Sequence, residues 1–173
     1  MIIREADFRD AAAIAAVHHL SWREAYRGIV PERVLEELDL PRLAEFWTRT
    51  LGEAPWPTFV TEADSGIVGF CSCVPARDGD LERDRAGEIS AIYLHPDSWG
   101  RGLGRALCRQ ALAALAARRC REAILWAFEA NHRAACFCEA IGFRRDGGRK
   151  DHPDLGLPLV RYRIDLVERE PGS

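Results

Sequence analysis

The stretch Trp99-Gly-Arg-Gly-Leu-Gly-Arg105 places three glycines at alternate positions, immediately before residues with helical periodicity. Glycine adopts positive φ at low cost, so such a turn can direct consecutive N–H groups toward one point. The first N–H groups of a helix lack intrahelical partners, and the helix dipole places about half a positive charge there. Two arginines in the stretch add full charges. The stretch therefore predicts a binding site for the phosphate groups of a ligand.

Two common phosphate-binding loops do not fit this stretch. A mononucleotide P-loop requires Gly-Lys followed by Ser or Thr, whereas the sole lysine of the chain is Lys150. A Rossmann fingerprint requires a third small residue three positions after its second glycine. Arg105 and Leu107 stand at the two positions where this residue would fall. We therefore expect neither a P-loop mononucleotide nor a dinucleotide as the ligand.

The flanking sequence predicts a strand, a tight turn and a helix, followed by a second strand and helix. The β-rich run 88–94 precedes the turn, and apolar positions in 102–118 recur at helical spacing. Strand 123–128 and helix 131–141, which Gly142 ends, make the second pair. Elsewhere we expect strands at 2–5, 58–61, 66–74 and 157–167, and helices at about 10–27, 31–38 and 41–51.

Length and composition favour a single domain spanning residues 1–173. A hydrophobic fraction of 47% supplies a core without disulfides or metal. The net charge of −3, with both signs scattered, argues against nucleic acid as a partner. The opening MIIREADFRD lacks the apolar region of a signal peptide, and no stretch is long enough to span a bilayer, so we expect a cytoplasmic protein without a membrane partner. None of the six cysteines forms a C-x-x-C pair, so we expect no metal site.

Several segments resemble the GNAT superfamily of N-acetyltransferases. Its pyrophosphate-binding signature, Gln/Arg-x-x-Gly-x-Gly/Ala, is matched by the last two glycines of the loop, with Trp99 in place of the usual first residue. The run 131–143 is similar to the family's Asn-x-x-A-x-x-F-Y-E-x-x-GF element. Segments 21–31 and 161–163 resemble the helix-to-loop segment and the last strand of many bacterial members. The likeness covers nearly the whole chain in the family's order.

The resemblance implies a fold and a cofactor. The fold would be α/β (α+β), a single GNAT-like domain with a mixed, mostly antiparallel central sheet, helices on both faces and one parallel strand pair splayed for acetyl-coenzyme A, the co-substrate. The pantetheine arm would bond to the backbone of Ile92 and Leu94. Asn131 would contact the pantetheine or the wedge in the sheet, and helix capping is a compatible role for it. The diphosphate would lie on the loop, whose cofactor-binding positions are Trp99, Gly100, Arg101, Gly102, Leu103, Gly104 and Arg105.

The resemblance also implies that the acetyl group passes directly to a primary amine in a ternary complex. A lysine-like amine must first lose a proton, at a cost of roughly 4 to 5 kcal/mol at neutral pH, so a general base helps. Glu88, eleven positions before Trp99, resembles the family's glutamate base; a strand-end salt bridge is the alternative interpretation. For a peptide α-amine the cost is only about 1 kcal/mol, and Glu88 would matter less.

The family's proton donor to the leaving thiolate is a tyrosine, but Cys138 stands at that position. The thiol of Cys138, water or Tyr93 would then supply the proton. We expect Trp22, Tyr26 and the turn at 63–66 to contact the acceptor, a small-molecule amine or a peptide amine. Because the tyrosine is missing, the alternative function is a catalytically silent module that binds acetyl-coenzyme A. A homodimer is compatible with the sequence.

Overall fold

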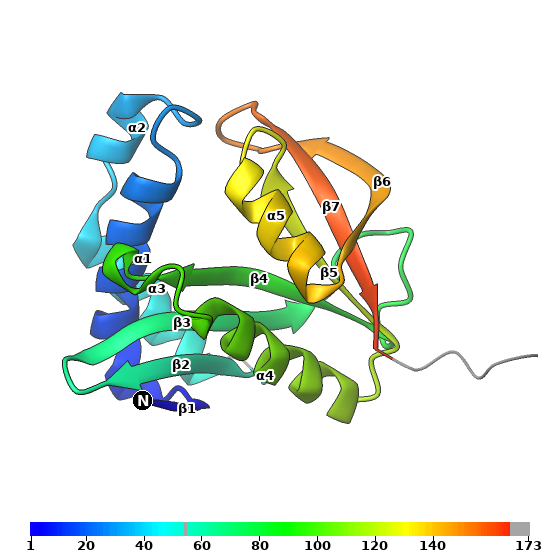
Figure 1. Ribbon diagram of the computed structural model, residues 1–173, viewed down its shortest axis with the longest axis horizontal. Helices are drawn as coiled ribbons and strands as arrows, with labels where there is room; N and C mark the ends of the chain where they lie inside the picture. Colours follow the sequence, from blue (N-terminus) through cyan, green and yellow to red (C-terminus); the bar gives the residue numbers. More distant parts are fainter. Residues whose placement is uncertain (54, 167–173) are drawn as a thin grey trace, which may run out of the picture. The chain divides into compact units, whose positions relative to one another are not determined.

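In the computed structural model, which describes residues 1–53 and 55–166, seven strands form one sheet in the order β1-β2-β3-β4-β5-β7-β6 (Figure 1). Neighbouring strands with an assigned register are antiparallel except β4 and β5, which run parallel. The expected mixed, mostly antiparallel sheet is therefore confirmed. The elements are β1 (Ile2–Glu5), η1 (Phe8–Asp10), α1 (Ala11–Ala25), α2 (Glu32–Glu36), α3 (Leu40–Glu53), β2 (Thr58–Ala63), β3 (Gly66–Pro75), β4 (Ala86–Leu94), η2 (Pro96–Ser98), α4 (Leu103–Ala117), β5 (Glu122–Phe128), α5 (His132–Ile141), β6 (Arg144–Asp151) and β7 (Pro158–Asp165).

Contacts within the chain group it into two compact units. One unit comprises Met1–Ser72 and Ala91–Ala111; the other comprises Cys73–Ser90 and the described residues from Leu112 onward. β3, β4 and α4 each contribute residues to both units.

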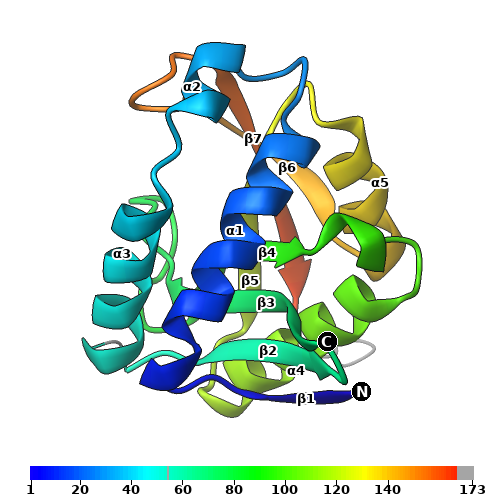
Figure 2. The same ribbon diagram turned by 90° about the vertical axis from the view of Figure 1, so that its left-hand side faces the viewer.

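The first unit packs two helices against a β-hairpin. α1 and α3 lie side by side (Figure 2). Ile14 of α1 and Trp47 of α3 are buried with Val60 of β2 and Phe70 of β3 in one apolar cluster. Burying such side chains stabilises a fold by about 1.5–3 kcal/mol each, so this cluster fixes the helices on the sheet.

The second unit is built on strands β5, β7 and β6, which are antiparallel neighbours. The start of β4 joins β5 in parallel over Ala86–Glu88, opposite Glu122–Ile124. Gly87 lets α4 approach this pair closely, because a Cβ there would lie 2.7 Å from a side-chain atom of Leu115. Glu88 is the last residue of β4 in this parallel register.

The structure confirms the predicted strands and helices with small shifts at their ends, and it adds one strand. β6 was not predicted, because its sequence RRDGGRKD has no apolar alternation and its side chains are mostly exposed. The last strand ends at Asp165; Val167, with which the predicted strand closes, lies outside the described residues. Among the described residues, no helix combines the length and apolar character that crossing a bilayer requires.

Candidate active site

The glycine-rich turn leads from η2 into α4. Gly100 and Gly102 have φ of +74° and +79°, in the left-handed region that glycine tolerates best. The N–H group of Ala106 donates to the carbonyl of Gly102 at 3.1 Å, so the intrahelical bonding of α4 begins there. The N–H groups of Leu103, Gly104 and Arg105 precede this first intrahelical donor. The turn therefore presents consecutive amides at the positive end of a 15-residue helix.

Trp99 ties this turn to the end of β4. Its indole Nε1–H donates to the carbonyl of Leu94 at 2.9 Å, and the hydroxyl of Ser21 donates to the same carbonyl at 2.6 Å. Trp99 thus replaces the family's usual Gln or Arg with a side chain that anchors the turn. Both lone pairs of the Leu94 carbonyl are engaged. A cofactor bond at Leu94 would therefore use its N–H group. Ile92 lies two residues earlier on the same strand.

The predicted acceptor residues Trp22 and Tyr26 lie together with Tyr93. The indole N–H of Trp22 donates to the hydroxyl of Tyr93 at 2.9 Å, and the Tyr26 and Tyr93 hydroxyls are 3.0 Å apart. The ring of His18 stacks on Tyr93, with ring centroids 4.9 Å apart. Burial raises the pKa of both tyrosines and lowers the pKa of His18 to about 4. The cluster is therefore uncharged at neutral pH.

Glu88 is a buried carboxyl group of the second unit. It is 9% exposed, and its Oε2 lies 3.8 Å from Nε of Arg77 in the loop before β4. Burial raises the pKa of Glu88, and the nearby cations of Arg77 and Lys150 oppose this shift. A carboxyl group held in this way accepts a proton more readily than an exposed glutamate does. Both interpretations of Glu88, base and ion pair, remain compatible with this geometry.

Asn131 is the N-cap residue of α5, and Cys138 lies within this helix. The side-chain oxygen of Asn131 accepts the N–H of Ala134 at 3.0 Å, so it caps the helix. This leaves the NH₂ group of Asn131 as the part that a cofactor would use. Cys138 is 1% exposed, and burial raises the pKa of its thiol to about 12. The thiol is therefore neutral at any ordinary pH.

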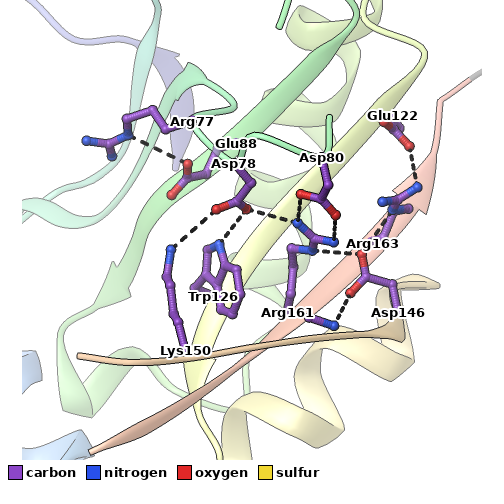
Figure 3. A network of polar contacts seen from close by, with 11 residues as sticks. Arg77, Asp78, Asp80, Glu88, Glu122, Trp126, Asp146, Lys150, Arg161 and Arg163 are labelled. Carbon is purple, nitrogen blue, oxygen red and sulfur yellow. Dashed lines mark hydrogen bonds and ion pairs between the residues drawn. The ribbon is translucent and has the colours of Figure 1, made fainter. Parts of the chain in front are cut away.

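Arg161 of β7 lies at the centre of a polar network that sequence reasoning did not find (Figure 3). Its guanidinium donates to Asp78 and Asp80, residues of the loop before β4, at 2.6–3.2 Å and to Asp146 of β6 at 2.8 Å. Trp126 of β5 also donates its indole N–H to Asp78, at 3.0 Å. Asp78 and Arg161 are 83 positions apart, so no local pattern announces their contact.

The structure brings the predicted residues of the first unit together through hydrogen bonds, whereas in the second unit it only places them on their elements. In the first unit, Leu94 joins Trp99 through a direct bond, and Trp22, Tyr26 and Tyr93 share hydrogen bonds. The backbone of 99–105 has the turn-to-helix form that the glycines predict, and Arg101 and Arg105 are exposed. In the second unit, Glu88 lies on β4, Cys138 lies on α5, and Asn131 is the N-cap residue of α5. The hydrogen bond from Trp126 to Asp78, 48 positions away, carries no local sequence signal by which it could have been found.

Comparisons with known proteins all find acetyltransferases. A model of the acetyltransferase (GNAT) family matches residues 14–143. A probable N-acetyltransferase of Mycobacterium tuberculosis is 28% identical over 94% of this chain and 92% of its own length. The N-acetyltransferase YuaI of Bacillus subtilis is 34% identical over 75% of this chain and 72% of its own length. Among solved structures, YncA of Salmonella typhimurium, determined with acetyl-CoA, has a TM-score of 0.73 and 20% identity, covering 100% of this chain and 98% of that one.

Proposed function

Because the chain belongs to the acetyltransferase (GNAT) family, we propose that it moves the acetyl group of acetyl-coenzyme A to a primary amine, by direct attack in a ternary complex. The observation that carries this proposal is the turn of 99–105, which presents amides without intrahelical partners and is anchored by Trp99 to the end of β4. The acetyl-CoA bound in the Salmonella relative of the same fold supports the choice of cofactor.

In this proposal the diphosphate lies on the turn. Leu103, Gly104 and Arg105 donate their N–H groups to phosphate oxygens, and the side chains of Arg101 and Arg105 add charge. The backbone of Ile92 and Leu94 and the NH₂ group of Asn131 hold the pantetheine arm. The charged contacts should weaken as ionic strength rises, since these arginines are exposed.

Replacing Gly102 by alanine should weaken the binding of coenzyme A about tenfold or more. Alanine at a φ of +79° costs about 1–2 kcal/mol, and the turn relieves this strain by moving its amides away from the phosphates. Isothermal titration calorimetry measures the change in affinity. Gly28→Ala is the matched control, because Gly28 has a φ of +78° and likewise no atom within 4 Å of an added Cβ.

Both variants should lose similar free energy of unfolding, and only Gly102→Ala should lose affinity. Equal affinities in the two variants would remove the phosphate-binding role from this turn.

Glu88 is the proposed general base. The amine nitrogen attacks the carbonyl carbon of the thioester, its proton passes to the Glu88 carboxylate, and the C–S bond then breaks to release the thiolate of coenzyme A. The elevated pKa of Glu88 brings its proton affinity closer to that of the amine, which favours this transfer. Trp22 and Tyr26 are proposed to contact the acceptor.

Water is the proposed proton donor to the leaving thiolate, with Tyr93 and Cys138 as the other two candidates. A thiol with a pKa of about 12 is a weaker acid than a coenzyme A thiol of ordinary pKa, about 8.5, so transfer from Cys138 is uphill. The hydroxyl of Tyr93 is already engaged with Trp22 and Tyr26.

Because water is the proposed donor, Cys138→Ala should change kcat by less than about threefold. Removal of a residue that acts as a general acid would typically lower kcat by at least about a hundredfold. Steady-state kinetics with saturating acetyl-coenzyme A measure this. A loss of more than tenfold, in a variant that still binds coenzyme A normally, would assign the proton transfer to the thiol.

Residues 1–173 are proposed to act as one catalytic domain in the cytoplasm, and light scattering would decide between a monomer and a homodimer. The function itself is tested by following release of the coenzyme A thiol with a panel of small amines and peptides. Turnover that requires both acetyl-coenzyme A and an amine supports the proposal. Tight binding of acetyl-coenzyme A with no turnover on any amine would contradict it and leave a silent binding module.

A further inference from the structure

Lys150 places its ammonium group on an aromatic ring beside a carboxylate. Its Nζ lies 3.9 Å from the centroid of the Trp126 ring and 3.6 Å from Oδ1 of Asp78 (Figure 3). An aromatic face and an anion together make a site for an organic cation. We call Trp126 and Asp78 the ammonium cradle.

Hydrogen bonds fix the position of the Asp78 carboxylate in the cradle. Oδ2 of Asp78 accepts the indole N–H of Trp126 at 3.0 Å and the Nη1–H of Arg161 at 3.2 Å. Arg161 is 7% exposed and is fixed in turn by Asp146. These bonds engage one oxygen of Asp78 and leave Oδ1 to face the ammonium group.

The occupant, by contrast, is held loosely. The side chain of Lys150 is 45% exposed, and 3.6 Å between Nζ and Oδ1 is too long for a good hydrogen bond. A lysine side chain has four rotatable bonds and a strongly hydrated head group. An external ammonium group therefore competes with a tethered group that makes no short hydrogen bond to Asp78, at an effective concentration on the order of millimolar.

The cradle also lies on the same sheet face as the proposed base. Glu88 pairs with Ile124 in the parallel register, and Trp126 follows Ile124 by two residues, so the side chains of Glu88 and Trp126 share a face. Strand geometry puts their Cα atoms about 8 Å apart. A short carbon chain spans this distance.

We propose that the ammonium cradle of Trp126 and Asp78 binds a second cationic group of the acceptor amine, and that Lys150 occupies the cradle until the acceptor displaces it. The inference rests on the proposed function. The cradle stabilises a charged amine, whereas the reacting nitrogen must be uncharged, so the two nitrogens of the acceptor have different sites. The acceptor class is therefore an amine that carries a second positive charge on a short spacer.

The single lysine allows a direct binding test without catalysis. In protein labelled with ¹³C-lysine, the ε-methylene group of Lys150 gives the only labelled ε signal. Its protons should lie upfield of those of free lysine, because they stack on the Trp126 ring. Adding diaminobutane should shift the signal toward the position of free lysine, while butanediol, of similar size but uncharged, should leave it unchanged.

A second measurement uses two variants and the acetylation reaction. Lys150→Met removes the internal competitor from an exposed site, so kcat/KM for diaminobutane should rise about three- to tenfold. Asp78→Asn weakens the cradle, so the same quantity should fall. For butylamine, which has no second cation, kcat/KM should respond only to the change in the proton affinity of Glu88, on which the charges of Lys150 and Asp78 also act. The ratio of kcat/KM for diaminobutane to kcat/KM for butylamine removes this shared effect, and it should rise in Lys150→Met and fall in Asp78→Asn.

The outcomes separate the inference from the function on which it rests. A Lys150 signal at the position of free lysine, or one that diaminobutane leaves in place, overturns the cradle even if the enzyme acetylates amines. A displaced signal with no acetyl transfer to any amine supports the cradle and contradicts the proposed function.

Discussion

Replacing Glu88 by glutamine should lower kcat/KM for a lysine-like amine by about 10²- to 10⁴-fold, the usual contribution of a general base. Glutamine preserves the size of the side chain but cannot accept the proton of the attacking amine. The measurement is kcat/KM against pH for both proteins. In the wild type kcat/KM should rise with pH through the pKa of Glu88, which burial places above the ordinary value. The variant should lack this rise.

The same substitution should stabilise the protein. Because the pKa of Glu88 is raised on folding, the folded state favours the protonated carboxyl, and stability is lost as pH rises through that pKa. Glu88→Gln removes this loss, so its free energy of unfolding should exceed that of the wild type at neutral pH, and the difference should shrink in acid. A variant with full activity and an unchanged pH profile would show that Glu88 only forms an ion pair with Arg77.

Replacing Arg161 by methionine should lower the free energy of unfolding by about 3 kcal/mol, the cost of removing one partner from a buried ionic network. The guanidinium is 7% exposed and serves three carboxylates, of which Asp78 and Asp146 are themselves 17% and 13% exposed. Methionine fills much of the same volume but leaves these carboxylates short of donors. Urea unfolding at neutral pH measures the loss.

Arg163→Met is the matched control, two residues further along β7. Its side chain is 33% exposed and bonds to Glu122 and Asp146, so the expected loss is below about 1 kcal/mol. Arg161 holds the pKa of Asp80 at about 2, so its contribution should fade as pH drops toward that value and the carboxylate protonates. Equal losses in the two variants, or a loss at Arg161 independent of pH, would contradict the network's structural role.

Much of the fold was predictable because local patterns carry it. Gly100 and Gly102 define a turn whose backbone conformation few other residues adopt, and the helix that follows has clear apolar periodicity. β6 was missed for a physical reason: it is the last strand of the sheet, and charged residues and glycine suit such an exposed edge. An edge strand of this kind has the composition of a loop.

In the candidate site, too, some features could be predicted from the sequence and others could not. The elements that carry Trp22, Tyr26, Tyr93 and Glu88 are predicted by the sequence, and the roles proposed for these residues come from the resemblance to a family. The contacts of the site residues could not be predicted in this way. The hydrogen bond from Trp99 to the carbonyl of Leu94, for example, depends on the shape of one turn. The ammonium cradle depends on contacts between a loop at 78 and strands at 126 and 150. Such contacts follow from tertiary structure, which no local pattern encodes.

The claim on which this account depends is that the turn of 99–105 holds the diphosphate of coenzyme A. Isothermal titration calorimetry of the wild-type protein and of Gly102→Ala with acetyl-coenzyme A, compared with S-acetylpantetheine, tests it most directly. The second ligand has the thioester and the pantetheine arm but lacks both the diphosphate and the adenosine nucleotide, so a loss in Gly102→Ala that is confined to acetyl-coenzyme A assigns the difference to the turn. We expect one site with a Kd on the order of micromolar for acetyl-coenzyme A and at least about tenfold weaker binding of S-acetylpantetheine. No heat from acetyl-coenzyme A, or equal affinity for both ligands, would contradict the account.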